Sequence, residues 1–139
     1  MSQSALPTLL RLRHAAREES HTALRRAEDE REAQAKRLAD LRAATVAARA
    51  ALEAADTLAL SSYHEFRARQ EVQERREIAR LQQREREVDL KRAQHHGRVR
   101  DELALEKFME RRAAEEEREE ARRDQERMDE LGRRKERSA

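Results

Sequence analysis

The chain lacks several residues on which compact folds depend. It has no cysteine, no tryptophan, one proline and two glycines, and tyrosine and phenylalanine together supply only three aromatic residues among 139. The absence of cysteine excludes disulfides and thiolate metal sites. With so few aromatic residues and 45% charged residues, the chain cannot build a conventional globular core. A long, solvated helix remains compatible with this composition.

Segments and motifs typical of several protein classes are also missing. No apolar run approaches the roughly 18 residues that a membrane-spanning helix needs, and the N-terminus lacks the basic and then apolar pattern of a signal peptide. There is no phosphate-binding glycine loop, nucleophile elbow or pair of histidines at i, i+4 spacing. His95 and His96 are adjacent, so on a helix they diverge and cannot easily share an ion. We therefore expect a cytoplasmic protein with no membrane insertion, catalytic residues, metal or cofactor.

Charge is abundant and nearly balanced. Lysine and arginine number 32 and aspartate and glutamate 30, for a net charge of +2. The two signs alternate along the chain, which allows i, i+4 pairs that support a helix by roughly 0.2–0.5 kcal/mol each and favours order over disorder. The pI is about 9.4, yet only the last few residues are net basic, so the sequence does not favour nucleic-acid binding.

Apolar and small residues recur at alternating spacings of three and four, which predicts coiled-coil helices. The first series contains Leu24, Ala27, Leu38, Leu41, Thr45, Ala48, Leu52 and Ala55, with Arg31 and Gln34 at inward positions. A second, weaker series contains Ile78, Leu81, Val88, His95 and Val99, with Glu85 and Arg92 at the equivalent inward positions. The pattern therefore predicts two helices.

The break between the two helices is placed by capping chemistry. Ser62 and Glu65 fit a capping box, in which the two residues satisfy each other's backbone amides. We expect an all-α antiparallel coiled-coil hairpin with a helix at about 6–57, a turn at about 57–62, a longer helix at about 63–131 and a basic tail at 132–139. Partners would then have numbers that sum to roughly 120. The hairpin predicts a monomer, whereas one continuous helix, forming a parallel homodimeric spacer, remains the alternative.

Three short segments carry apolar or aromatic residues beyond what one seam needs. Four leucines crowd the N-terminus, at Leu6, Leu9, Leu10 and Leu12. Met128 and Leu131 stand alone near the end of a highly charged helix, as anchors for a groove in another protein would. Tyr63 and Phe66 lie beside the predicted turn, three positions apart. For the leucines and for the aromatic pair, packing within the hairpin and contact with a partner are both open. For Met128 and Leu131 the alternative to partner contact is a solvated spacer.

Together these segments resemble the FliJ family of flagellar type III export proteins. Residues 124–131, Asp-Gln-Glu-Arg-Met-Asp-Glu-Leu, are similar to the family's Gln-rich or Glu-rich stretch that ends in a hydrophobe, Asp, Glu and another hydrophobe. Leu9–Arg13, followed by Glu18 and Glu19, resembles the family's N-terminal segment. Tyr63 and Phe66 resemble the aromatic pair that opens its second helix.

The resemblance implies a non-enzymatic stalk subunit of the export ATPase complex, at the cytoplasmic face of the flagellar basal body. Its chain ends would point into the hexameric ATPase FliI, and the part nearer the turn would contact the export gate protein FlhA. The implied ATPase contacts are Leu9, Leu10, Leu12, Met128, Asp129, Glu130 and Leu131, and the implied gate contacts are Tyr63, Phe66 and Gln70. Export chaperones are possible further partners, and the equivalent stalk of a virulence type III secretion system is the alternative.

Overall fold

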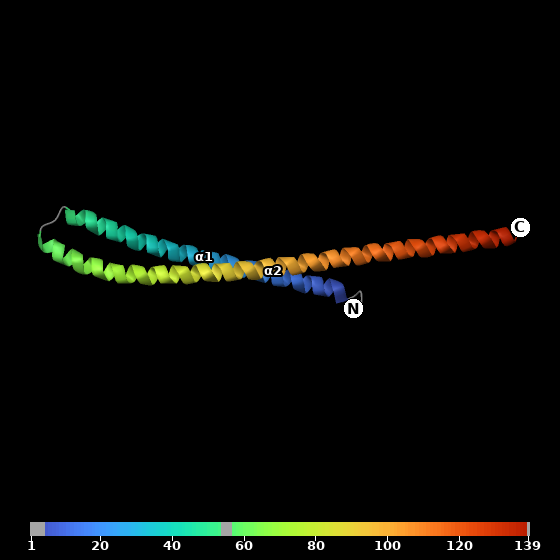
Figure 1. The fold of residues 1–139 in the computed structure, drawn as a ribbon, viewed down its shortest axis with the longest axis horizontal. Coiled ribbons are helices and arrows are strands. Elements are labelled where there is room, and N and C mark those ends of the chain that lie inside the picture. The colour runs from blue at the N-terminus through green and yellow to red at the C-terminus, as the bar shows by residue number, and fades with distance from the viewer. Residues whose placement is uncertain (1–4, 54–56, 139) are drawn as a thin grey trace. The chain divides into compact units, whose positions relative to one another are not determined.

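The chain folds into two long α-helices that form a hairpin (Figure 1). The computed structural model describes residues 5–53 and 57–138. Helix α1 spans Ala5–Glu53 (49 residues) and helix α2 spans Thr57–Arg137 (81 residues). Early residues of α1 pair with late residues of α2, for example Arg13 with Asp101, while Arg42 pairs with Glu74. The predicted all-α antiparallel hairpin with a longer second helix is therefore confirmed.

The position of the turn was predicted wrongly. Thr57–Ser62, expected to form the turn, are the first residues of α2, and α1 already ends at Glu53. This stretch contains good helix formers such as Leu58, Ala59 and Leu60, and it has neither glycine nor proline to oppose the helix. Ser62 therefore lies inside α2, and its capping pattern does not mark the start of the helix. Ala55, expected in the first seam, lies outside the described residues.

The C-terminal boundary also differs from the prediction. The helix was expected to end near Leu131, before Gly132 and a basic tail, but α2 continues to Arg137. No described glycine has a positive φ, so Gly132 does not form the left-handed cap that ends many helices. A single helical glycine costs about 1 kcal/mol relative to alanine, which did not suffice to end this helix. The last turn carries basic side chains, which stabilise the helix because their positive charges lie near the negative end of the helix dipole. They are Arg134, Lys135 and Arg137.

The described residues divide into two compact units. Residues 17–97 form the first unit, in which α1 and α2 pack through a thin core. Leu24, Ala27 and Val88 make one buried cluster, and Leu38 is buried as well. The predicted seam residues nearer the turn, such as Leu41 and Leu52, are only half-buried. The predicted seam thus exists, but it is tightest in the part of this unit that is distant from the turn.

Polar residues at the predicted inward positions behave differently from one another. Gln34 is buried at 4% exposure, as expected, whereas Arg31, Glu85 and Arg92 are exposed rather than inward. A long charged side chain beside a seam can pack its aliphatic part against the seam and extend its charged group into solvent. Gln34 lies against Glu77, closer to the start of α2 than a turn near residue 60 predicts. This register agrees with α1 ending at Glu53 and α2 beginning at Thr57.

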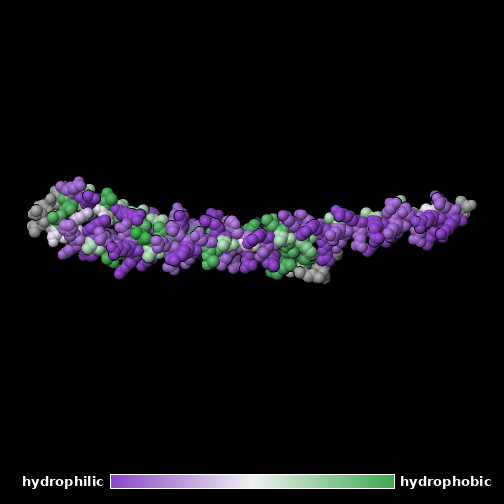
Figure 2. Space-filling view, viewed as in Figure 1, coloured by the Kyte–Doolittle hydropathy of each residue, from purple (hydrophilic) through white to green (hydrophobic). Residues whose placement is uncertain are grey.

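The second unit contains the described residues of 1–16 and 98–139. Here α1 and α2 pair over a short distance: Leu6 is buried, Arg13 forms an ion pair with Asp101 at 3.3 Å, and His14 contacts the buried Glu102 at 3.0 Å. Beyond this pairing α2 continues without a partner helix, and every residue from 117 to 138 is exposed. Figure 2 shows that this end of α2 is almost uniformly hydrophilic.

Candidate partner-binding sites

The N-terminal leucines divide into packed and exposed residues. Leu6 is buried at 5% exposure, and Leu9 and Leu10 are half-buried. Leu12 is 63% exposed. Much of the leucine crowding thus serves the pairing of α1 with α2 in this unit, and Leu12 is the member of the group that is most open to a partner.

The C-terminal candidates differ in their availability. Met128 and Leu131 are 69% and 62% exposed, and their spacing of three places both on one face of α2. Asp129 accepts a hydrogen bond from Gln125 at 3.1 Å, and Glu130 pairs with Arg134 at 3.5 Å. The two carboxylates therefore have partners within the helix, while the two apolar side chains lie in solvent.

The two groups of proposed ATPase contacts are not adjacent. Leu12 precedes Arg13, which pairs with Asp101. Met128 lies about 40 Å farther along α2 than Asp101, since a helix rises 1.5 Å per residue. A partner that touches both Leu12 and Met128 would therefore have to extend along α2, and the two residues do not form one compact site.

The proposed gate contacts lie together on α2 in the unit of residues 17–97. Tyr63, Phe66 and Gln70 are each half-buried, and their spacings of three and four keep them on one side of the helix. The ring of Tyr63 lies beside that of His64, with centroids 6.1 Å apart. The Oε1 atom of Gln70 is buried and has no hydrogen-bond partner. These residues form a continuous row along α2, part of which packs inside the hairpin.

The sequence did not reveal a buried polar layer in the same unit. The side-chain amide of Gln34 donates to the Glu77 carboxylate and, at 3.3 Å, to the Glu77 backbone carbonyl. Arg80 donates to the other carboxylate oxygen of Glu77 at 2.9 Å. Glu77 is buried at 8% exposure, and these contacts satisfy its charge. The predicted turn lay too late in the sequence and therefore paired Gln34 with the wrong residues of α2. The correct position of the turn would have predicted the contact between Gln34 and Glu77.

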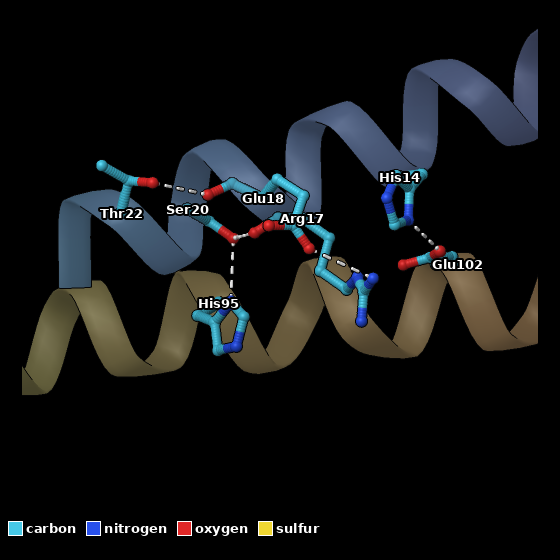
Figure 3. A network of polar contacts seen from close by, with 7 residues as sticks. All are labelled: His14, Arg17, Glu18, Ser20, Thr22, His95 and Glu102. Atoms are coloured by element: carbon cyan, nitrogen blue, oxygen red, sulfur yellow. Dashed lines mark hydrogen bonds and ion pairs between the residues drawn. The ribbon is translucent and has the colours of Figure 1, made fainter. Parts of the chain in front are cut away.

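A second polar cluster involves histidines that appeared unremarkable in the sequence (Figure 3). The Ser20 hydroxyl donates to the Arg17 carbonyl at 2.7 Å and lies 3.0 Å from Nδ1 of His95. Since the hydroxyl has a single hydrogen, Nδ1–H of His95 must donate to the Ser20 oxygen. The His95 ring also lies against that of His21, with centroids 5.3 Å apart. His95 thus joins the two helices through side-chain contacts.

The described residues were also compared with the requirements of a metal site and of a membrane span. Within residues 5–53 and 57–138, no three histidine, aspartate or glutamate side chains meet as metal ligands. No helix in the described part of the chain is both long enough and apolar enough to cross a bilayer.

Comparison with known proteins identifies a family. A search of curated proteins and a search of solved structures found no matching protein. The model of a protein family described as "Flagellar FliJ protein" matches residues 2–138, which is nearly the whole sequence. The chain belongs to the FliJ family of flagellar export proteins.

Proposed function

We propose that this protein is the non-enzymatic stalk of the flagellar export ATPase complex, and that it inserts its chain ends into the FliI ring. The proposal rests on the exposure of Met128 and Leu131, which lie on the part of α2 that is not packed against α1. The chain belongs to the FliJ family. Apolar anchors on a helix face are a common means of docking into a groove. Leu12 supplies a further exposed contact, with Leu9 and Leu10 half-buried beside it.

The same proposal includes a contact with the export gate protein FlhA through Tyr63, Phe66 and Gln70. These residues are half-buried, so the gate would touch the edge of the row that α1 leaves open. This places the protein at the cytoplasmic face of the basal body, with export chaperones as further partners.

An asymmetric stalk cannot make six identical contacts with a sixfold ring at once. The C-terminal part of α2 is highly charged and carries few apolar side chains, so each contact with the ring is small. Weak contacts spread over the ring would let the stalk promote ring assembly or couple neighbouring subunits without locking one orientation. The family description names the flagellum, which favours this role over the equivalent stalk of a virulence secretion system.

The test is stimulation of the cognate export ATPase by purified protein. Truncation after Gln125 removes Met128 and Leu131, and we expect it to abolish stimulation while most of the helix content remains. The double variant Met128→Ala with Leu131→Ala should lose most of the stimulation as well. Val46→Ala is the matched control, because Val46 is 68% exposed but lies in the unit of residues 17–97. Full stimulation by both C-terminal variants would refute the proposed role.

A further inference from the structure

The last 21 residues of α2 are helical without support from another helix. Each of residues 117–137, the solitary segment, is exposed. Helices in proteins usually depend on packing an apolar face, and isolated helices shorter than about 12–15 residues are marginal in water. The solitary segment has only Met128 and Leu131 as large apolar residues, and both are in solvent. Its stability must therefore come from interactions within the helix.

Side-chain pairs connect successive turns of the solitary segment. Each pair joins residues three or four positions apart, which are neighbours on a helix surface. The five contacts are Glu119–Arg123 at 3.7 Å, Arg122–Glu126 at 3.2 Å, Asp124–Arg127 at 3.8 Å, Gln125–Asp129 at 3.1 Å and Glu130–Arg134 at 3.5 Å. In two of them a glutamate precedes an arginine by four residues, which is the more favourable order for such pairs.

The C-terminal end of the segment is also closed by local contacts. The backbone amide of Ser138 donates to the Arg134 carbonyl at 3.1 Å, and the Ser138 hydroxyl donates to the same oxygen at 2.7 Å. Carbonyls in the last turn of a helix otherwise lack partners in the chain. The segment is thus supported along its length and at its end without help from α1.

We propose that residues 117–137 form a free-standing strut, supported by ion pairs, that stays helical in the unbound protein. At 1.5 Å per residue the strut is about 30 Å long. It holds Met128 and Leu131 on one face before any partner arrives, so binding there would not incur the entropic cost of folding a disordered tail. This property does not depend on which partner the protein has.

The first test measures the length and order of the strut in the full chain. The sequence contains no cysteine, so spin labels at Glu115→Cys and Arg133→Cys would be the only ones attached. A continuous helix predicts a narrow distance distribution near 27 Å between the labelled backbone positions. The distribution should not change with protein concentration. A broad distribution at low salt, or order that appears only as the protein dimerises, would overturn the proposal.

The second test asks what holds the segment helical, by hydrogen exchange of the full chain. Glu119→Lys with Glu126→Lys replaces two attractive pairs by repulsive ones, and amide exchange in residues 117–137 should accelerate about fivefold or more. The unaltered chain should also exchange faster at 1 M salt, where charges are screened beyond about 3 Å. The charge-reversed control, Arg122→Glu with Glu126→Arg, keeps an opposite-charge pair and should retain the original rates.

The apolar double variant separates the strut from the proposed function. Met128→Ala with Leu131→Ala should leave exchange in residues 117–137 within about twofold, because alanine is a strong helix former. If this variant melts the segment, or if the lysine variant does not accelerate exchange, ion pairs are not what supports it. Neither measurement involves a partner, so loss of ATPase stimulation bears on the proposed function alone.

Discussion

Helix α2 is held in two different ways along its length. Near Val88 it is supported by packing: Val88 is 4% exposed and lies in a buried cluster with Leu24 and Ala27 of α1. In the solitary segment no residue is buried, and contacts three or four residues apart connect one turn with the next. The difference shows that helix formation and helix pairing have separate causes in this chain. Charge patterning suffices for a helix, whereas pairing requires a seam.

The core of the paired region is small and partly polar. Among the described residues of 17–97, the buried apolar residues are Leu24, Ala27, Leu38 and Val88. Gln34 and Glu77 are buried in the same pair of helices. With so few buried residues, each should contribute a large share of the free energy of pairing. The solitary segment should respond hardly at all to changes in this core, and the following predictions test that contrast.

The largest effect is expected from Leu38→Ala. Leu38 is 5% exposed, and removing a buried leucine side chain typically costs about 2–5 kcal/mol through lost burial and the cavity left behind. Hydrogen exchange should accelerate throughout residues 17–97 and remain unchanged in residues 117–137. Denaturant unfolding would give the free-energy change. Equal acceleration in both regions would mean that the two are stabilised together.

An intermediate effect is expected from Gln34→Leu. The substitution leaves the buried Glu77 carboxylate without its amide donor, which should lower the free energy of unfolding by about 1–3 kcal/mol. The double variant Gln34→Leu with Glu77→Leu removes both polar groups and should recover that loss, because apolar replacement of a buried polar pair is often neutral or stabilising.

The double variant also tests whether the polar layer sets the register. A buried polar contact between coiled-coil helices can specify register at a cost in stability. Distances between spin labels at Ala23→Cys and Lys91→Cys should be narrow in the unaltered chain and broader in the double variant. An equally narrow distribution in both would show that the apolar seam alone fixes the register.

The smallest effect is expected from Leu131→Ala. Leu131 is 62% exposed in a segment without a partner helix, so its truncation should change the free energy of unfolding by less than about 0.5 kcal/mol. Thermal and denaturant unfolding of the variant should match those of the unaltered chain. A loss as large as that from Leu38→Ala would reveal that Leu131 is packed in solution.

The exposure of the candidate contact residues could be predicted from the sequence for some of them and not for others. The exposure of Met128 and Leu131 follows from a sequence in which the surrounding residues are charged and no partner helix is available. The division among Leu6, Leu9, Leu10 and Leu12 did not follow, because four leucines in seven positions surround much of a helix and only the direction of α2 decides which are covered. The same holds for Gln70, whose buried Oε1 atom depends on the packing of the hairpin.

The sequence by itself determined that the chain is helical, because period and charge spacing are local properties. It favoured a single reversal with a longer second helix but left one continuous helix open as the alternative. It did not determine where the reversal occurs: the serines of the predicted cap lie within α2, and a local capping motif is a weak signal when the surrounding residues also favour helix. The tertiary structure decided the register, and with it the pairing of Gln34 with Glu77 and of Ser20 with His95. Those contacts join residues distant in sequence, and only the packing of one helix against the other brings them within hydrogen-bonding distance.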